Sequence, residues 1–173
     1  KDVSAPTIKN FLHYAEEAYL IFQLQRFELS AKKRIKSERK IYTIDNGFFS
    51  AKKVSLSQDW GRLLENLMFQ ELVRRHFQPN LNLFYHQNSD GTEVDFLVRE
   101  SDLSFSLIQV CYDMSNVQTR EREIRALQRA IKELSPKRAE ILTHDYQDEI
   151  ILEGLKVPIT PVRNWINTST LFY

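Results

Sequence analysis

Four positions in the middle of the sequence have the order and spacing of a metal-dependent nuclease site. Glu65 lies on an expected helix, Asp95 on an expected strand, and Gln109 and Cys111 on the strand that follows. Such a site needs oxygen ligands for a divalent cation and a positive side chain that steadies the developing negative charge. A spacing of two puts Gln109 and Cys111 on one face of their strand. The four positions are therefore expected to converge.

Two of the four residue types do not suit that chemistry. Gln109 offers a carbonyl oxygen to Mg²⁺ or Mn²⁺ but no charge, and the thiol of Cys111 is soft and supplies no ammonium. Losing a positioned cation or acid–base group costs roughly 10²-fold to 10⁴-fold in rate. Glu93 is interpreted as a poor replacement, pointing to the opposite face from the neighbours of Asp95. We expect no meaningful turnover, with Glu65, Asp95 and Gln109 as candidate ligands of a vestigial metal site.

Glu65, Glu71 and Cys111 can also be explained by structural roles, without a metal or catalytic site. Glu65 lies at the border of an apolar helix face and Glu71 near its middle, where a carboxylate is costly unless it has a partner, a metal or a raised pKa. An ion pair and a metal site explain Glu65 equally well. For Glu71 we favour an ion pair with an arginine such as Arg74 or Arg75. Cys111, in an apolar strand, is expected to be a buried and inert thiol.

A basic segment between residues 31 and 40 forms a second candidate site. It holds six basic residues against one acid, Glu38. Such a segment can bind phosphates, because each neutralised charge releases a counterion. A solvated segment whose charge only aids solubility or keeps strand edges from pairing explains it equally well. The nucleic-acid-binding candidates are Lys32, Lys33, Arg34, Lys36, Arg39 and Lys40.

The elements that position these residues fall into two parts. Residues 1–52 combine a helix from Thr7 with strands at 20–27 and 40–45, the outline of a partial winged helix with a basic hairpin tip. In residues 53–173, two amphipathic helices, a three-strand meander and returning strands predict a mixed α/β sheet flanked by helices. The helices of this second part are expected at 61–77 and 119–134, and the strands at 82–87, 93–99, 104–114, 139–145 and within 156–166.

The composition excludes several classes of protein. The 173 residues are 42% apolar, and Lys plus Arg (24) balances Asp plus Glu (23), so overall charge does not indicate a nucleic-acid partner. The single cysteine excludes an internal disulfide and multi-cysteine zinc sites. We find no GxxxxGK[ST] loop and no apolar run long enough for a membrane span. We expect a cytoplasmic protein with no membrane partner, cut from a longer chain because Lys1 replaces an initiator Met.

Several stretches resemble one family. "GRLLEN...FQEL", "GTEVDFLV" and "LIQVCYDM...TREREIRAL" are similar to the C-terminal region of bacterial and archaeal AAA-type ATPases that carry a DUF4143 domain. "TIKNFLHYAEEAYLIFQLQRF" and "KIYTIDNGF" resemble the winged-helix portion of these proteins. The opening helix "GRLLEN" is also similar to that of archaeal Holliday junction resolvases, which favours Glu65 over Glu71 as the site acid.

The resemblance carries expectations about fold, cofactor and partners. It implies a winged helix followed by a PD-(D/E)XK nuclease-like domain, whose site positions fall on Glu65, Asp95, Gln109 and Cys111. ATP is expected only in a missing N-terminal ATPase domain, which is then a partner of this piece.

Three functions remain open from the sequence. The first is a non-catalytic C-terminal module of an AAA-type ATPase that binds DNA or a protein partner. The second is an active Mg²⁺- or Mn²⁺-dependent deoxyribonuclease that uses Glu65, Asp95 and Gln109. The third is a partner-docking surface, of toxin–antitoxin or similar type, with no nucleic acid. For the second function the missing cation would come from a residue such as Arg99, Arg120 or Arg122.

Overall fold

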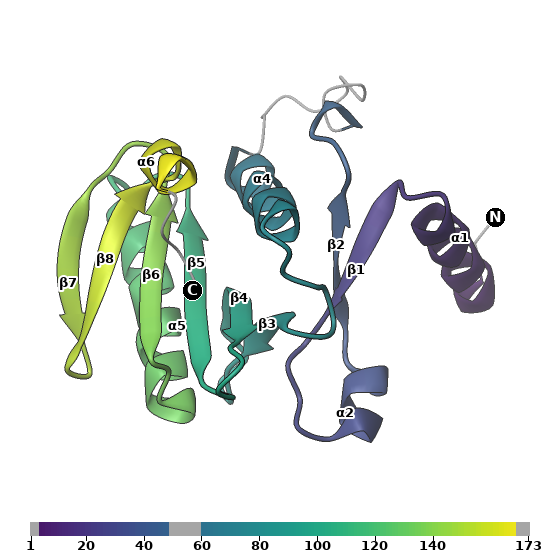
Figure 1. Ribbon diagram of the computed structural model, residues 1–173, viewed down its shortest axis with the longest axis horizontal. Coiled ribbons are helices and arrows are strands. Elements are labelled where there is room, and N and C mark those ends of the chain that lie inside the picture. The colour runs from purple at the N-terminus through teal and green to yellow at the C-terminus, as the bar shows by residue number, and fades with distance from the viewer. Residues whose placement is uncertain (1–3, 49–59, 169–173) are drawn as a thin grey trace.

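The computed structural model describes residues 4–48 and 60–168, and a six-stranded mixed sheet forms its centre (Figure 1). The strand order is β3-β4-β5-β6-β8-β7, with an antiparallel meander of the first three strands. β6 and β8 continue the sheet in parallel, and β7 pairs antiparallel with β8 at the edge. The strands are β3 (Leu83–Gln87), β4 (Glu93–Arg99), β5 (Phe105–Cys111), β6 (Arg138–Thr143), β7 (Asp148–Leu152) and β8 (Leu155–Pro161).

Helices cover both faces of this sheet, as the order of elements predicted. α4 (Trp60–Arg74) and α6 (Val162–Asn167) pack on one face, where Phe69 and Trp165 join a core with Phe96 of β4. α5 (Val117–Leu134) covers the other face through residues such as Leu127. The mixed α/β sheet flanked by helices is therefore confirmed, whereas β7 and α6 were not predicted.

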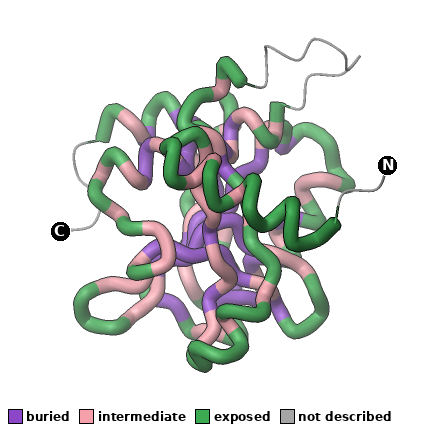
Figure 2. Tube along the Cα trace, turned by 90° about the vertical axis from the view of Figure 1, so that its right-hand side faces the viewer, coloured by how far each residue is buried: buried purple, intermediate pink, exposed green. Residues whose placement is uncertain are grey.

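The N-terminal part shares the core of the sheet rather than forming one of its own. It comprises α1 (Ala5–Glu17), β1 (Ile21–Gln25), α2 (Ala31–Lys36) and β2 (Arg39–Thr43). β1 and β2 form an antiparallel pair, and Tyr42 of β2 stacks on Phe69 of α4 with ring centroids 4.2 Å apart. α1 buries no residue and lies exposed on the surface (Figure 2).

The connection between β1 and β2 differs from the expected hairpin tip. The six-residue helix α2 occupies it, so the basic segment presents a helix and not a loop. The expected boundary near residue 52 lies outside the described residues. The winged-helix assignment of residues 1–52 stays a prediction.

Arg75, paired with Glu71, joins the end of α4 to α6. The Glu71 carboxylate accepts hydrogen bonds from Arg74 (2.7 Å) and from Nε of Arg75 (2.8 Å), which confirms the expected ion pair. Burial acts to raise the pKa of Glu71, but the two guanidinium groups outweigh it and hold the pKa below its ordinary value. The Arg75 guanidinium also lies 4.2 Å from the ring centroid of Trp165 and donates to the carbonyl of Ile166 at 2.9 Å.

Replacing Arg75 by Met should lower the free energy of unfolding by about 2–4 kcal/mol, because a buried carboxylate loses a partner and α6 loses its anchor. The matched change Arg74→Met should cost less than about 1 kcal/mol, since that side chain is 68% exposed. Urea unfolding of the two variants measures the difference. Equal losses would contradict the assignment of Arg75 as the anchor.

Candidate functional site

Three carboxylates converge on one ammonium group where β2, α4 and β4 meet. Nζ of Lys40 lies 2.8 Å from Oδ1 of Asp95, 3.1 Å from Oε1 of Glu65 and 3.7 Å from Oε2 of Glu93. The hydroxyl of Tyr42 donates to the same Glu65 oxygen at 2.7 Å. We call these five residues the Lys40 cluster. It holds both acids that the sequence indicated, together with a cation from a strand not expected to contribute.

A β-bulge in β4 brings Asp95 to this position. Asp95 and Phe96 together oppose the single residue Tyr85 of β3, so the pairing shifts by one residue. Asp95 contacts Lys40 on the side of the sheet where Phe96 packs under α4. β4 pairs with β5 from Phe96 to Arg99, just beyond Asp95. Oδ2 of Asp95 accepts a hydrogen bond from the backbone N–H of Val110 at 2.9 Å. One oxygen of Asp95 is thus fixed by the sheet and the other by Lys40.

Gln109 and Cys111 do not join the Lys40 cluster. Val110, between them, packs in the α4-side core, whereas Gln109 donates its amide to Glu123 of α5 and Cys111 packs in the α5-side core. The expected convergence of the four positions is therefore corrected: the structure brings Glu65 and Asp95 together and directs Gln109 and Cys111 to the opposite face. Burial, reinforced by the charge of Glu123, raises the pKa of Cys111 to about 11, so its thiol stays protonated at neutral pH.

Glu93 also differs from its expected place. Its carboxylate shares Lys40 with Asp95, two residues along the strand. Alternation along the first residues of β4 puts Glu93 and Asp95 on one side, before the bulge changes the phase. No sequence signal identified Tyr42, although it lies two residues from Lys40 and so on the same side of β2.

The charges within the Lys40 cluster stabilise one another. Burial acts to lower the pKa of Lys40, but Asp95 and Glu65 outweigh it and raise the pKa above its ordinary value. Burial and the charge of Asp95 raise the pKa of Glu65, against the opposing effect of Lys40 and Tyr42. Burial, with Glu65, also raises the pKa of Tyr42 well above its usual range. At neutral pH the cluster therefore holds a charged ammonium and a protonated phenol.

This arrangement does not fit a bound Mg²⁺ or Mn²⁺ ion. The ammonium of Lys40 already lies between the oxygens that a cation would need. Within residues 4–48 and 60–168, no group of three or more His, Cys, Asp or Glu side chains is arranged to hold a metal. Gln109, the third expected ligand, faces α5.

The basic segment divides into three kinds of side chain. Lys40 is neutralised in its cluster, so its assignment to a phosphate-binding surface is corrected. Arg34 packs over the ring of Phe84 at 5.4 Å and donates to the carbonyl of Glu28 at 2.9 Å. The remaining four are exposed and form no ion pair with a described residue: Lys32, Lys33, Lys36 and Arg39. We call these four residues the basic surface.

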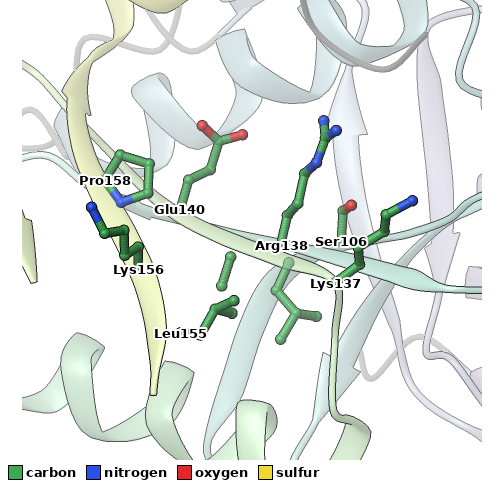
Figure 3. Close-up of a pocket in the computed structure, with 9 residues that line it drawn as sticks. Ser106, Lys137, Arg138, Glu140, Leu155, Lys156 and Pro158 are labelled. Atoms are coloured by element: carbon green, nitrogen blue, oxygen red, sulfur yellow. The ribbon is translucent and has the colours of Figure 1, made fainter. Parts of the chain in front are cut away.

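A further titratable group, Glu140, lies on the central strand β6. Figure 3 shows Glu140 and Arg138 directed to the same side of a cavity of about 230 Å³. Glu140 accepts hydrogen bonds from the Trp165 indole at 3.1 Å, and burial raises its pKa to about 7 against the effect of that donor. The sequence did not predict this group.

Replacing Lys40 by Met should lower the free energy of unfolding by about 2–4 kcal/mol at pH 7, because it leaves buried carboxylates without a counter-charge. The stabilisation by Lys40 is fully present at pH 7, since that pH lies below both the ordinary pKa of 10.5 and the raised pKa in the folded chain. In the variant the penalty should shrink as pH falls below about 5 and the carboxylates take up protons. Urea unfolding at pH 7 and pH 4 tests this, with Lys36→Met as control. A loss independent of pH would contradict the cluster as described.

Two family models match successive stretches of the chain. Residues 60–163 match "Domain of unknown function (DUF4143)" and residues 1–59 match "Domain of unknown function (DUF8612)". An uncharacterized protein of Methanocaldococcus jannaschii is 43% identical over 148 residues, which cover 85% of this chain and 32% of that protein. An uncharacterized protein of Haemophilus influenzae is 22% identical over 151 residues, covering 87% and 35%. The chain spans about a third of the length of these relatives.

One solved structure also aligns with the chain. It is the refined half-complex from a tetradecameric assembly of Thermococcus gammatolerans McrB AAA+ hexamers with bound McrC. The alignment has a TM-score of 0.40 and 10% identity over 60% of this chain and 28% of that one, too distant to support an argument. None of the described helices is long and apolar enough to span a bilayer. On the match over residues 60–163, the chain belongs to the DUF4143 family.

Proposed function

We propose that this chain is a non-catalytic module of a longer protein with an ATPase domain, and that it binds the phosphate backbone of DNA. The observation that carries the proposal is the basic surface of Lys32, Lys33, Lys36 and Arg39, whose charges are exposed and unpaired among the described residues. Unpaired cations on one short segment attract phosphates because counterion release drives their binding. A protein partner with an acidic surface is the alternative ligand.

The Lys40 cluster supports the absence of catalysis. A hydrolytic site needs carboxylates free to hold a cation and a positive group free to stabilise the transition state. Here Lys40 binds Asp95 and Glu65 directly, so neither kind of group is free. The order α4-β3-β4-β5-α5-β6, with acids on the helix and on the bulged strand, supports a PD-(D/E)XK nuclease-like ancestry for this part.

The ATPase partner rests on two other observations. The sequence resembles the C-terminal region of AAA-type ATPases, and the relatives are about three times as long as the matched segment. In this proposal ATP binds in the ATPase domain, outside this chain. α1 and the β1–β2 pair form part of a winged helix. The whole protein is cytoplasmic.

Reversing two charges of the basic surface, Lys32→Glu with Lys33→Glu, should weaken binding of a short DNA duplex at least about 10-fold. It should also reduce the slope of log affinity against log salt by about two. Fluorescence anisotropy across a salt series measures both quantities. The matched control is Lys9→Glu with Arg163→Glu, which makes the same charge change at exposed positions on α1 and α6. Unchanged binding in the first variant would refute DNA binding but not a protein partner.

One observation favours a second candidate function, a Mg²⁺- or Mn²⁺-dependent deoxyribonuclease. The ammonium that Cys111 cannot supply is present as Lys40, 2.8 Å from Asp95. Catalysis would then use Glu65 and Asp95 as metal ligands, with Lys40 supplying the positive charge in place of Cys111, and would require Lys40 to release the carboxylates when a metal binds.

On the primary proposal, the chain should not nick supercoiled plasmid in the presence of Mn²⁺ any faster than its Asp95→Ala variant. Agarose gels of timed reactions with both proteins, purified identically, provide the measurement. Nicking by the unmodified chain that Asp95→Ala abolishes would establish the nuclease and overturn the non-catalytic assignment. Equal nicking by both proteins would identify a contaminant.

A further inference from the structure

A separate cavity of about 490 Å³ opens where the carboxyl ends of β5 and β6 meet the start of α4. Its walls combine leucines of α4 with the rings of Trp60, Tyr112 and His144. Tyr112 directly follows β5, and His144 directly follows β6, its parallel neighbour. Ligands of α/β sheets commonly bind just beyond the carboxyl ends of parallel strands. The volume is in the range of small-ligand sites.

The three rings form a continuous aromatic series. Trp60 and Tyr112 lie nearly parallel, 16° apart with centroids separated by 5.9 Å, and Tyr112 lies 4.8 Å from His144 at 31°. The indole N–H of Trp60 and the hydroxyl of Tyr112 have no hydrogen-bond partner among the described residues. Near-parallel aromatic faces suit a flat heteroaromatic ligand better than a branched aliphatic side chain.

Trp60 is half exposed at the rim of this cavity, unlike the other tryptophan of the chain. Its side chain is 49% exposed, whereas the second tryptophan, Trp165, is 2% exposed in the core. Large aromatic residues left open beside an apolar cavity commonly mark a binding site. The Lys40 cluster uses none of these residues.

We propose that this cavity binds a nucleobase of single-stranded nucleic acid, stacked on the Trp60–Tyr112–His144 series. The inference rests on the proposed nucleic-acid function and adds the form of the ligand: an unpaired base, held by its face. Because every base has a π-face, binding should show little base preference and weaker salt dependence than binding at the basic surface.

The two tryptophans provide a direct readout. The chain contains two Trp residues, so in a Trp165→Phe variant all tryptophan emission comes from Trp60. Titration with an oligothymidylate of about eight nucleotides should quench this emission, and an abasic oligomer of the same length should not. The unmodified chain is titrated in parallel, in case Trp165→Phe disturbs folding. Tyr112→Leu should lower the affinity about 5- to 100-fold, the usual contribution of one stacked base.

The same titrations separate this inference from the proposed function. Lys32→Glu with Lys33→Glu should weaken oligothymidylate binding but leave the quenching at saturation unchanged. Equal quenching by the abasic oligomer would overturn the stacking site. So would oligomer binding, detected by anisotropy, that leaves Trp60 emission unchanged, and this result would leave the basic surface intact. Stacking without any effect of the two lysines would keep the cavity and show that the basic surface does not contribute to binding of the oligomer.

Discussion

The ammonium of Lys40 is the point on which the arrangement of the chain depends. It joins β2, α4 and β4 through Lys40, Glu65 and Asp95, which lie successively 25 and 30 positions apart in sequence. Its nitrogen lies 2.8 to 3.7 Å from oxygens of Glu65, Glu93 and Asp95. Without a cation there, Glu65, Glu93 and Asp95 would repel one another in a partly buried site. The same contact holds the β1–β2 pair against the sheet, where Tyr42 completes the aromatic core with Phe69. One ion-pair network therefore neutralises the three carboxylates and also holds the N-terminal β1–β2 pair against the sheet.

The sequence predicted the layers of the fold because they depend on periodic burial. The expected strand at 93–99 has the bounds observed for β4, and both long helices were found close to their expected positions. Elements without such a pattern were missed. β7 reads "DEIIL" and is largely exposed at the sheet edge, so no alternation marks it. α2 was taken as a hairpin tip, although Ala, Lys and Arg are good helix formers and the connection is too long for a tight turn.

The site was predicted only in part, for two physical reasons. Glu65 and Asp95 were found from their order, but the bulge at Asp95 leaves no trace in the residue pattern. A change of phase by one residue separates Gln109 and Cys111 from the face that Asp95 occupies. Lys40 was counted with its basic neighbours because composition does not show which cation turns inward. An ion pair between residues 40 and 95 has no periodic signature, so only the folded chain shows it.

The internal position of Lys40 disfavours a divalent metal ion at the three carboxylates by a simple competition. An ammonium tethered to the fold faces the carboxylates at a high effective concentration, whereas a divalent ion must arrive from solution. The metal would also have to displace two hydrogen bonds, at 2.8 and 3.1 Å, and leave the ammonium without its partners. The four residues of the basic surface have no such ion pairs to break, since their charges remain in solvent. The fold thus neutralises Glu65, Glu93 and Asp95 with its own ammonium and leaves the four cations of the basic surface in solvent.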